Sequence, residues 1–144
     1  MDTALLPDPR EGGLSSELPK ARLEKAVRLL SLEKRKESAG AGLLLARILP
    51  RFFASAEEVF ADERGKLLHP RLFLSLAHGG GMAVLAVGER PVGCGVEKFS
   101  RVRETVLRRF SKEERAFVRE AAGERAREGA FYRIWTGKES YLKR

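Results

Sequence analysis

The spacing of apolar residues changes twice along this chain, and this change limits the possible folds more than any single motif does. Apolar residues recur at helical intervals up to residue 53 and again after residue 101. Between these parts lie three short apolar runs separated by glycine-rich turns, at residues 71–77, 82–87 and 92–97. Runs joined this tightly predict a three-stranded antiparallel meander. We therefore expect an α+β fold, with helices packed on one face of a small sheet.

The first half of the sequence predicts two helices, over residues 18–30 and 32–53. Ser31 suits the N-cap of the second helix, and Pro50 is expected to kink or end it. Gly40 and Gly42 each cost a helix about 1 kcal/mol relative to alanine, so they indicate close packing there. Ala4-Leu5-Leu6 predicts a short strand before these helices.

The second half predicts further helices after the sheet. Ser111 and Glu114 have the spacing of a capping box, in which the N-cap and N3 side chains satisfy backbone amides at a helix start. A final helix is expected after Gly129. We divide the chain into an α+β lobe, residues 1–98, and a helical second lobe, residues 99–144.

The charge of the chain favours anionic partners. The sequence holds 28 Lys and Arg against 20 Asp and Glu, a formal charge of +8. The single cysteine, Cys94, excludes an intramolecular disulfide and agrees with a reducing compartment. Because no targeting segment or membrane-length apolar run is present, we expect a cytoplasmic protein without a membrane partner.

Residues 131–144 carry a pattern that suits a ligand site. In a helix, Trp135, Lys138, Glu139 and Lys143 share one face. A carboxylate between lysines can hold Mg²⁺ while the ammonium groups neutralise phosphate oxygens. The same pattern also fits an ordinary solvated helix face anchored by one tryptophan.

Two strand-end residues are further candidates. His78 precedes three glycines, whose bare backbone lets a ligand approach closely. Glu97 ends the third predicted strand, from which it could reach a site against the last helix. Each has an ordinary alternative, a structural hydrogen bond for His78 and a solvated charge for Glu97.

Seven segments in order resemble a 4'-phosphopantetheinyl transferase of the two-lobed type that activates carrier proteins. The resemblance runs from about residue 18 to residue 144, and its most specific part is the pattern W-x-x-K-E-x-x-x-K near the end. The segments are LPKARLEK at 18–25, ESAGAGLLL at 37–45, GK at 65–66, SLAH at 75–78, PVGCGVEK at 91–98, FSKEE at 110–114 and FYRIWTGKESYLK at 131–143.

The resemblance implies Mg²⁺-dependent transfer of phosphopantetheine from coenzyme A to a serine of an acidic acyl or peptidyl carrier protein. By position it assigns the 3'-phosphate of coenzyme A and its neighbouring groups to Arg22, Lys25, Ser38 and His78. It places Lys66 near the adenine, Lys143 on the pyrophosphate, and Glu114 beside the pantetheine arm. Glu97 and Glu139 match magnesium ligands, and Glu139 also matches the group that takes the proton of the attacking serine.

Three departures from the family pattern count against full activity. Gly95 stands where the strand motif G-x-D-x-E has its aspartate, which leaves two carboxylates for the metal. Ala77 and Gly79 replace the two serines that usually flank the histidine. The sequence ends before the second sheet of two-lobed members, so we expect either a truncated copy or a compact form completed by a homo-oligomer or another chain.

Three interpretations stay open from the sequence. The first is the transferase, and the second is a catalytically impaired module that binds coenzyme A or a carrier protein. The third, a nucleic-acid-binding protein, has only the charge in its favour, so we expect no nucleic acid partner. The first requires that Glu97, His78, Glu139 and Lys143 converge on one pocket of diphosphate size.

Overall fold

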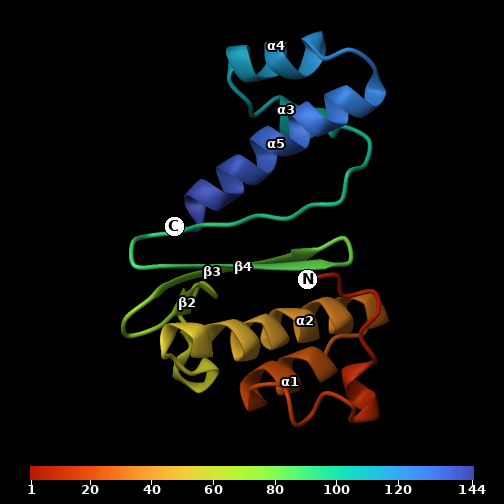
Figure 1. The fold of residues 1–144 in the computed structure, drawn as a ribbon. Helices are drawn as coiled ribbons and strands as arrows, with labels where there is room; N and C mark the ends of the chain where they lie inside the picture. Colours follow the sequence, from red (N-terminus) through yellow and green to blue (C-terminus); the bar gives the residue numbers. More distant parts are fainter.

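The computed structural model describes residues 1–144 and confirms a mixed α+β chain with small antiparallel sheets (Figure 1). Two two-stranded sheets form, β1–β2 and β3–β4. The α-helices are α1 (Lys20–Val27), α2 (Leu32–Ile48), α3 (Glu104–Leu107), α4 (Lys112–Glu120) and α5 (Glu124–Leu142). The strands are β1 (Phe60–Ala61), β2 (Leu67–Leu68), β3 (Phe73–Gly79) and β4 (Met82–Gly88), and the 3₁₀ turns are η1 (Pro9–Glu11), η2 (Leu49–Phe52) and η3 (Ala56–Glu58).

Helix α2 lies against one face of the β3–β4 hairpin, with α1 on its other side (Figure 1). It ends at Ile48 and passes into η2, whose first turn holds Pro50, so the proline ends the helix as predicted. A Cβ atom at Gly40 would lie 2.4 Å from the Thr3 side chain, and one at Gly42 would lie 2.6 Å from that of Leu18. The predicted close packing at both glycines is confirmed.

The prediction of a three-stranded sheet is wrong, because residues 92–97 form no ladder with the hairpin. Their backbone is held by side-chain contacts instead. The Cys94 amide donates to Ser75 Oγ at 3.0 Å, and the Cys94 thiol donates to the Ser75 carbonyl at 3.0 Å. The segment runs along the hairpin, with Val92 against Gly88 and Lys98 against Gly80, and joins neither sheet.

The segment 92–100 forms a layer between the hairpin and α5 (Figure 1). Gly93 lies against Ser140, Gly95 against Thr136, and Ser100 Oγ is 2.7 Å from the Tyr132 hydroxyl. The segment therefore runs antiparallel to α5.

The predicted strand at Ala4-Leu5-Leu6 is also wrong. The N-terminal pairing falls two residues earlier, where Asp2 bridges Met82 and the Thr3 amide donates to the Gly81 carbonyl at 2.8 Å. Residues 4 to 6 are a turn and bend instead. The N-terminus thereby fastens the turn between β3 and β4.

The helical second part has an apolar cluster of its own, formed by α3, α4 and α5. Its buried members are Leu107, Phe110, Val118, Ala130, Phe131 and Tyr132. The predicted capping box of α4 is confirmed, with the Ser111 amide donating to Glu114 Oε2 at 2.7 Å and the Glu114 amide donating to Ser111 Oγ at 3.2 Å. The division into lobes 1–98 and 99–144 stays a proposal.

No helix of the chain combines the length and the apolar composition that a membrane crossing requires.

Candidate functional site

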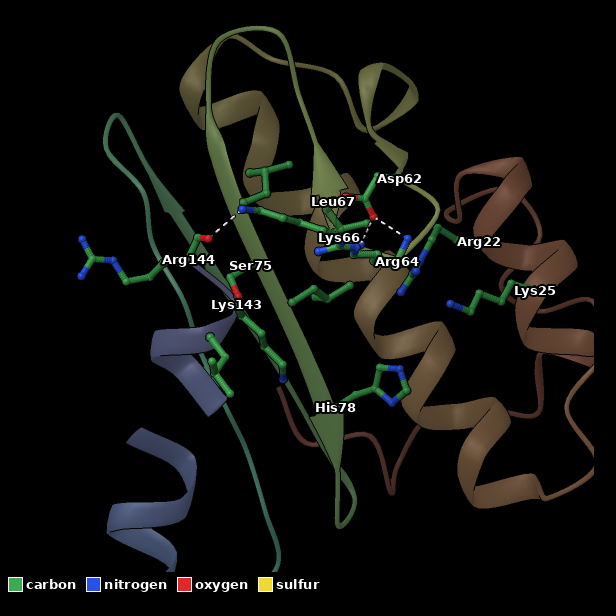
Figure 2. A pocket seen from close by; sticks show the side chains of 14 residues that line it. Arg22, Lys25, Asp62, Arg64, Lys66, Leu67, Ser75, His78, Lys143 and Arg144 are labelled. Atoms are coloured by element: carbon green, nitrogen blue, oxygen red, sulfur yellow. Dashed lines mark hydrogen bonds between the residues drawn. The ribbon is translucent and has the colours of Figure 1, made fainter. Parts of the chain in front are cut away.

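A cavity of about 550 Å³ opens where four distant parts of the chain meet (Figure 2). Helix α1, the turn between β1 and β2, strand β3 and the C-terminal end of α5 each supply part of its wall. Its lining residues are Arg22, Lys25, Asp62, Arg64, Gly65, Lys66, Leu67, Leu74, Ser75, Leu76, His78, Leu142, Lys143 and Arg144. The volume falls in the range of about 300–1,000 Å³ that is typical of small-molecule sites.

The charge on the cavity wall is strongly positive. Six lysine and arginine side chains and His78 line it, against one carboxylate, that of Asp62. Asp62 Oδ1 also accepts hydrogen bonds from the amides of Arg64 and Lys66, at 2.9 and 2.8 Å. This carboxylate holds the β1–β2 turn that presents the two cations. The cavity is therefore built for an anionic ligand.

Arg22 carries the clearest sign of a missing anionic partner. Its Nε and one of its terminal nitrogens are buried and have no hydrogen-bond partner. Burial lowers the pKa of the guanidinium, because a charged group loses water contacts there. A planar guanidinium with free donors matches phosphate oxygens in geometry and charge.

His78 faces the same cavity from β3 and touches a buried carboxylate behind it. Its Nδ1 lies 3.7 Å from Glu37 Oε2. Burial lowers the pKa of the imidazole, Glu37 acts in the opposite direction, and the positive charges of Arg22 and Lys25 lower the pKa further. The net effect of these surroundings is a His78 pKa below its usual value.

Glu37 was not predicted, since the sequence places it in a run of charges that suits a solvated helix face. Its side chain is wholly buried on α2 and accepts hydrogen bonds from Lys34 Nζ at 2.8 Å and from the Gly81 amide at 3.0 Å. Burial opposes ionisation, but these hydrogen bonds hold the pKa of Glu37 below its usual value. Only the fold shows that this carboxylate supports the turn after His78.

The last turn of α5 closes the cavity. Lys143 follows the end of this helix and lines the wall, and Lys66 Nζ donates to the Arg144 carbonyl at 2.7 Å. In Figure 2 the Lys143 side chain reaches from α5 toward the space beside His78. The two halves of the chain thus meet at this site.

The structure brings together five of the six residues predicted to bind coenzyme A. Arg22, Lys25, Lys66, His78 and Lys143 all line the cavity. The sequence analysis missed Arg64 and Arg144, which flank the predicted Lys66 and Lys143. Their positions beside those lysines were the available signal, but a surface arginine is too common to be selected by that alone.

The other predicted site residues do not line the cavity. Ser38 is buried inside α2, and its hydroxyl has no hydrogen-bond partner. Glu97 lies near enough to Lys34 to help raise the pKa of that lysine. Glu114 caps α4 and pairs with Lys138 at 2.9 Å. Of the four residues expected to converge, only His78 and Lys143 share this space, and roles for Ser38, Glu97, Glu114 and Glu139 stay predictions.

Glu97 and Glu139, the two carboxylates expected to bind Mg²⁺, belong to no larger cluster of metal-binding side chains. No group of three or more His, Cys, Asp or Glu side chains is placed to bind one ion. Glu139 Oε2 lies 3.4 Å from the position of a Cβ atom at Gly95. A carboxylate at position 95 would therefore lie beside that of Glu139, but glycine has no side chain to supply one. Mg²⁺ is usually held by one or two carboxylates together with waters and substrate phosphates, so the metal roles of Glu97 and Glu139 stay predictions.

Comparison with known proteins agrees with the resemblance seen in the sequence. Residues 91–144 match the family model described as the 4'-phosphopantetheinyl transferase superfamily. The chain is also 22% identical over 134 residues to the 4'-phosphopantetheinyl transferase gsp of Aneurinibacillus migulanus, a match that covers 90% of this chain and 56% of the relative. The chain thus spans a little over half the length of this curated relative. The similarity to this superfamily is confirmed.

Proposed function

We propose that this chain acts as a 4'-phosphopantetheinyl transferase, with its basic cavity holding the nucleotide end of coenzyme A. The observation that carries the proposal is the gathering of Arg22, Lys25, Lys66, His78 and Lys143 around one cavity, from four elements distant in sequence. The 3'-phosphate and diphosphate of coenzyme A supply the anionic charge that this wall lacks.

The reaction proposed is a displacement at phosphorus. The oxygen of a carrier-protein serine forms a bond to the β-phosphorus of coenzyme A, while the bond from this phosphorus to the adenosine-side bridging oxygen breaks. Phosphopantetheine remains on the serine, the serine proton is lost, and adenosine 3',5'-bisphosphate leaves. Negative charge grows on the leaving bisphosphate, so the fixed cations of the cavity stabilise the transition state.

Two residues at the C-terminal end of α5, Glu139 within the helix and Lys143 just after it, have distinct roles in this proposal. Lys143 neutralises the diphosphate from the end of the helix. Glu139 lies four residues earlier, on the same helix face as Lys143, and takes the proton of the attacking serine. No step is assigned to a metal ion. The dependence on Mg²⁺ expected from the family resemblance is left to the assay, which is run with and without this ion.

The partner proposed is an acidic acyl or peptidyl carrier protein. A chain with a formal charge of +8 attracts an acidic partner over distances comparable to the Debye length and raises the rate of encounter. We therefore expect transfer to slow as ionic strength rises. An acidic carrier modified equally fast at low and high salt would argue against this steering.

The experiment that tests the function is a transfer assay with intact-mass detection. The purified chain is incubated with coenzyme A and a carrier protein, and the carrier is then weighed. We expect the mass of one phosphopantetheine group to be added, and no addition to a carrier whose acceptor serine is replaced by alanine. Coenzyme A binding without any carrier modification would instead support the catalytically impaired binding module.

A further inference from the structure

Glu37 is the one fully buried carboxylate of the chain, and it lies directly behind the cavity. It joins α2 to the turn that follows β3, because its Oε1 accepts a hydrogen bond of 3.0 Å from the Gly81 amide. Its Oε2 accepts a hydrogen bond of 2.8 Å from Lys34 Nζ and lies 3.7 Å from His78 Nδ1. A buried carboxylate needs such compensation to stay charged, since its desolvation is costly.

The two ring nitrogens of His78 lie in different surroundings. Nδ1 is buried, has no hydrogen-bond partner and faces Glu37. The side chain as a whole keeps 30% of its surface exposed and lines the cavity, so the other nitrogen, Nε2, is available to a ligand there. A proton on Nδ1 favours the contact with Glu37, and a second proton on Nε2 would face a bound anion.

The charges around His78 are otherwise positive. Arg22 and Lys25 face it from α1, and Lys143 lines the same cavity from α5. Glu37 on α2 supplies the negative charge that reaches the ring. Without this carboxylate, the imidazole would be harder to protonate in this cationic site.

We propose that Glu37 is a positioning residue, which fixes the His78 ring toward the cavity and supports its protonated form when a phosphate group binds there. This inference rests on the proposed function, because it assumes that the cavity takes the phosphates of a nucleotide. Glu37 does not touch the ligand itself. It acts through the imidazole and through the turn that it ties to α2.

The test compares Glu37→Gln with Glu33→Gln, which removes the same charge from an exposed position one turn earlier on α2. Glutamine keeps an oxygen for the Gly81 amide, and Lys34 is half-exposed and can turn to solvent. The chain has two histidines, so the imidazole signals in an NMR titration are assigned with a single His78→Gln variant. This titration needs no ligand.

We expect Glu37→Gln to lower the pKa of His78 and Glu33→Gln to leave it in place. Binding of adenosine 3',5'-bisphosphate at pH 7.5 should weaken about tenfold in Glu37→Gln, with a smaller loss at pH 5.5, where protonation is easier. In a His78→Gln background, Glu37→Gln should have no further effect on binding. If the glutamine variant folds poorly, Glu37→Asp is the second variant. It keeps the negative charge, so the pKa of His78 should stay close to its wild-type value.

The outcomes separate this inference from the proposed function. A His78 pKa that is equal in wild type and Glu37→Gln would overturn the inference alone, as would equal losses of binding from Glu37→Gln with and without His78. A wild-type chain that binds no bisphosphate would overturn the proposed function and this inference with it.

Discussion

The hydroxyl of Ser140 on α5 donates a hydrogen bond of 2.8 Å to the backbone carbonyl of Gly93. This bond joins the helical part of the chain to the segment that runs along the β3–β4 hairpin. A Cβ atom at Gly93 would lie only 1.7 Å from the Ser140 carbonyl oxygen, so the helix can dock here only against a glycine. The contact brings the end of α5, and with it Lys143, to the cavity.

The first prediction concerns Gly93→Ala. We expect the added methyl group to push α5 away and to lower the free energy of unfolding by about 2–3 kcal/mol, as overpacking does elsewhere. Urea denaturation measures this. The control is Gly137→Ala on α5, where a Cβ atom meets nothing within 4 Å and should stabilise the helix slightly. Equal stability of the wild type and Gly93→Ala would mean that α5 does not dock here.

The second prediction concerns Gly95→Asp. A side chain at this position begins 3.4 Å from Glu139 Oε2, so the new carboxylate would form a pair with it. We expect Mg²⁺ to bind about tenfold more tightly or better, because the number of charged oxygen ligands sets the affinity of such sites. Calorimetric titration with Mg²⁺ measures this, and Gly95→Asn is the neutral control of equal size. An unchanged affinity in Gly95→Asp would show that Glu139 does not belong to a metal site.

The third prediction concerns the ion pair between Asp8 and Arg35, whose Oδ2 and terminal nitrogen are 2.6 Å apart. The hydrogen bond from Arg35 lowers the pKa of Asp8 from 3.8 to about 2. Because the pKa is lowered in the folded state, the stability from this pair is present above pH 3.8 and is lost as the pH falls toward 2.

Melting temperatures between pH 5 and pH 2 check this third prediction. Asp8→Asn should melt lower than the wild type at pH 5, and the difference should shrink toward pH 2. Glu11→Gln, at an exposed acid of the neighbouring turn η1, should follow the wild type throughout. A difference between Asp8→Asn and the wild type that stays constant with pH would contradict the assigned role of the pair.

The fourth prediction separates stability from binding at Arg22. Its buried guanidinium has donors without partners, a cost that an apolar side chain of similar volume removes. We expect Arg22→Met to raise the free energy of unfolding by about 1 kcal/mol and to weaken bisphosphate binding at least about tenfold. Arg28→Met, at an exposed arginine just after α1, should change neither quantity. A destabilised Arg22→Met would contradict the idea that this residue is kept for ligand binding.

The parts of the fold that follow from local patterns could be predicted from the sequence. The capping box at Ser111 and Glu114 and the helix end at Pro50 each depend on a few neighbouring residues. The third strand could not be excluded in this way. Its apolar residues suit a strand, and only the approach of α5 and the bonds of Cys94 to Ser75 show that it packs against the hairpin without joining the sheet.

The residues of the candidate site also fall into those that the sequence predicts and those that only the fold shows. Four of the six lysine and arginine residues of the cavity could be named from the family resemblance, because each lies in a recognisable segment. The buried state of Glu37 and the capping role of Glu114 could not, since a carboxylate in a charged run is usually solvated. Whether a charge faces a ligand, a helix end or a buried imidazole depends on how distant elements meet, and the order of residues does not state this.

The central claim is that α1, the β1–β2 turn and the end of α5 form one site for the nucleotide end of coenzyme A. Calorimetric titration of the chain with adenosine 3',5'-bisphosphate tests it most directly. We predict one bisphosphate bound per chain, and a loss of affinity of about tenfold or more in each of Arg22→Met, Lys66→Met and Lys143→Met but not in Arg28→Met. No binding by the wild type, or binding that these three substitutions leave unchanged, would contradict the claim.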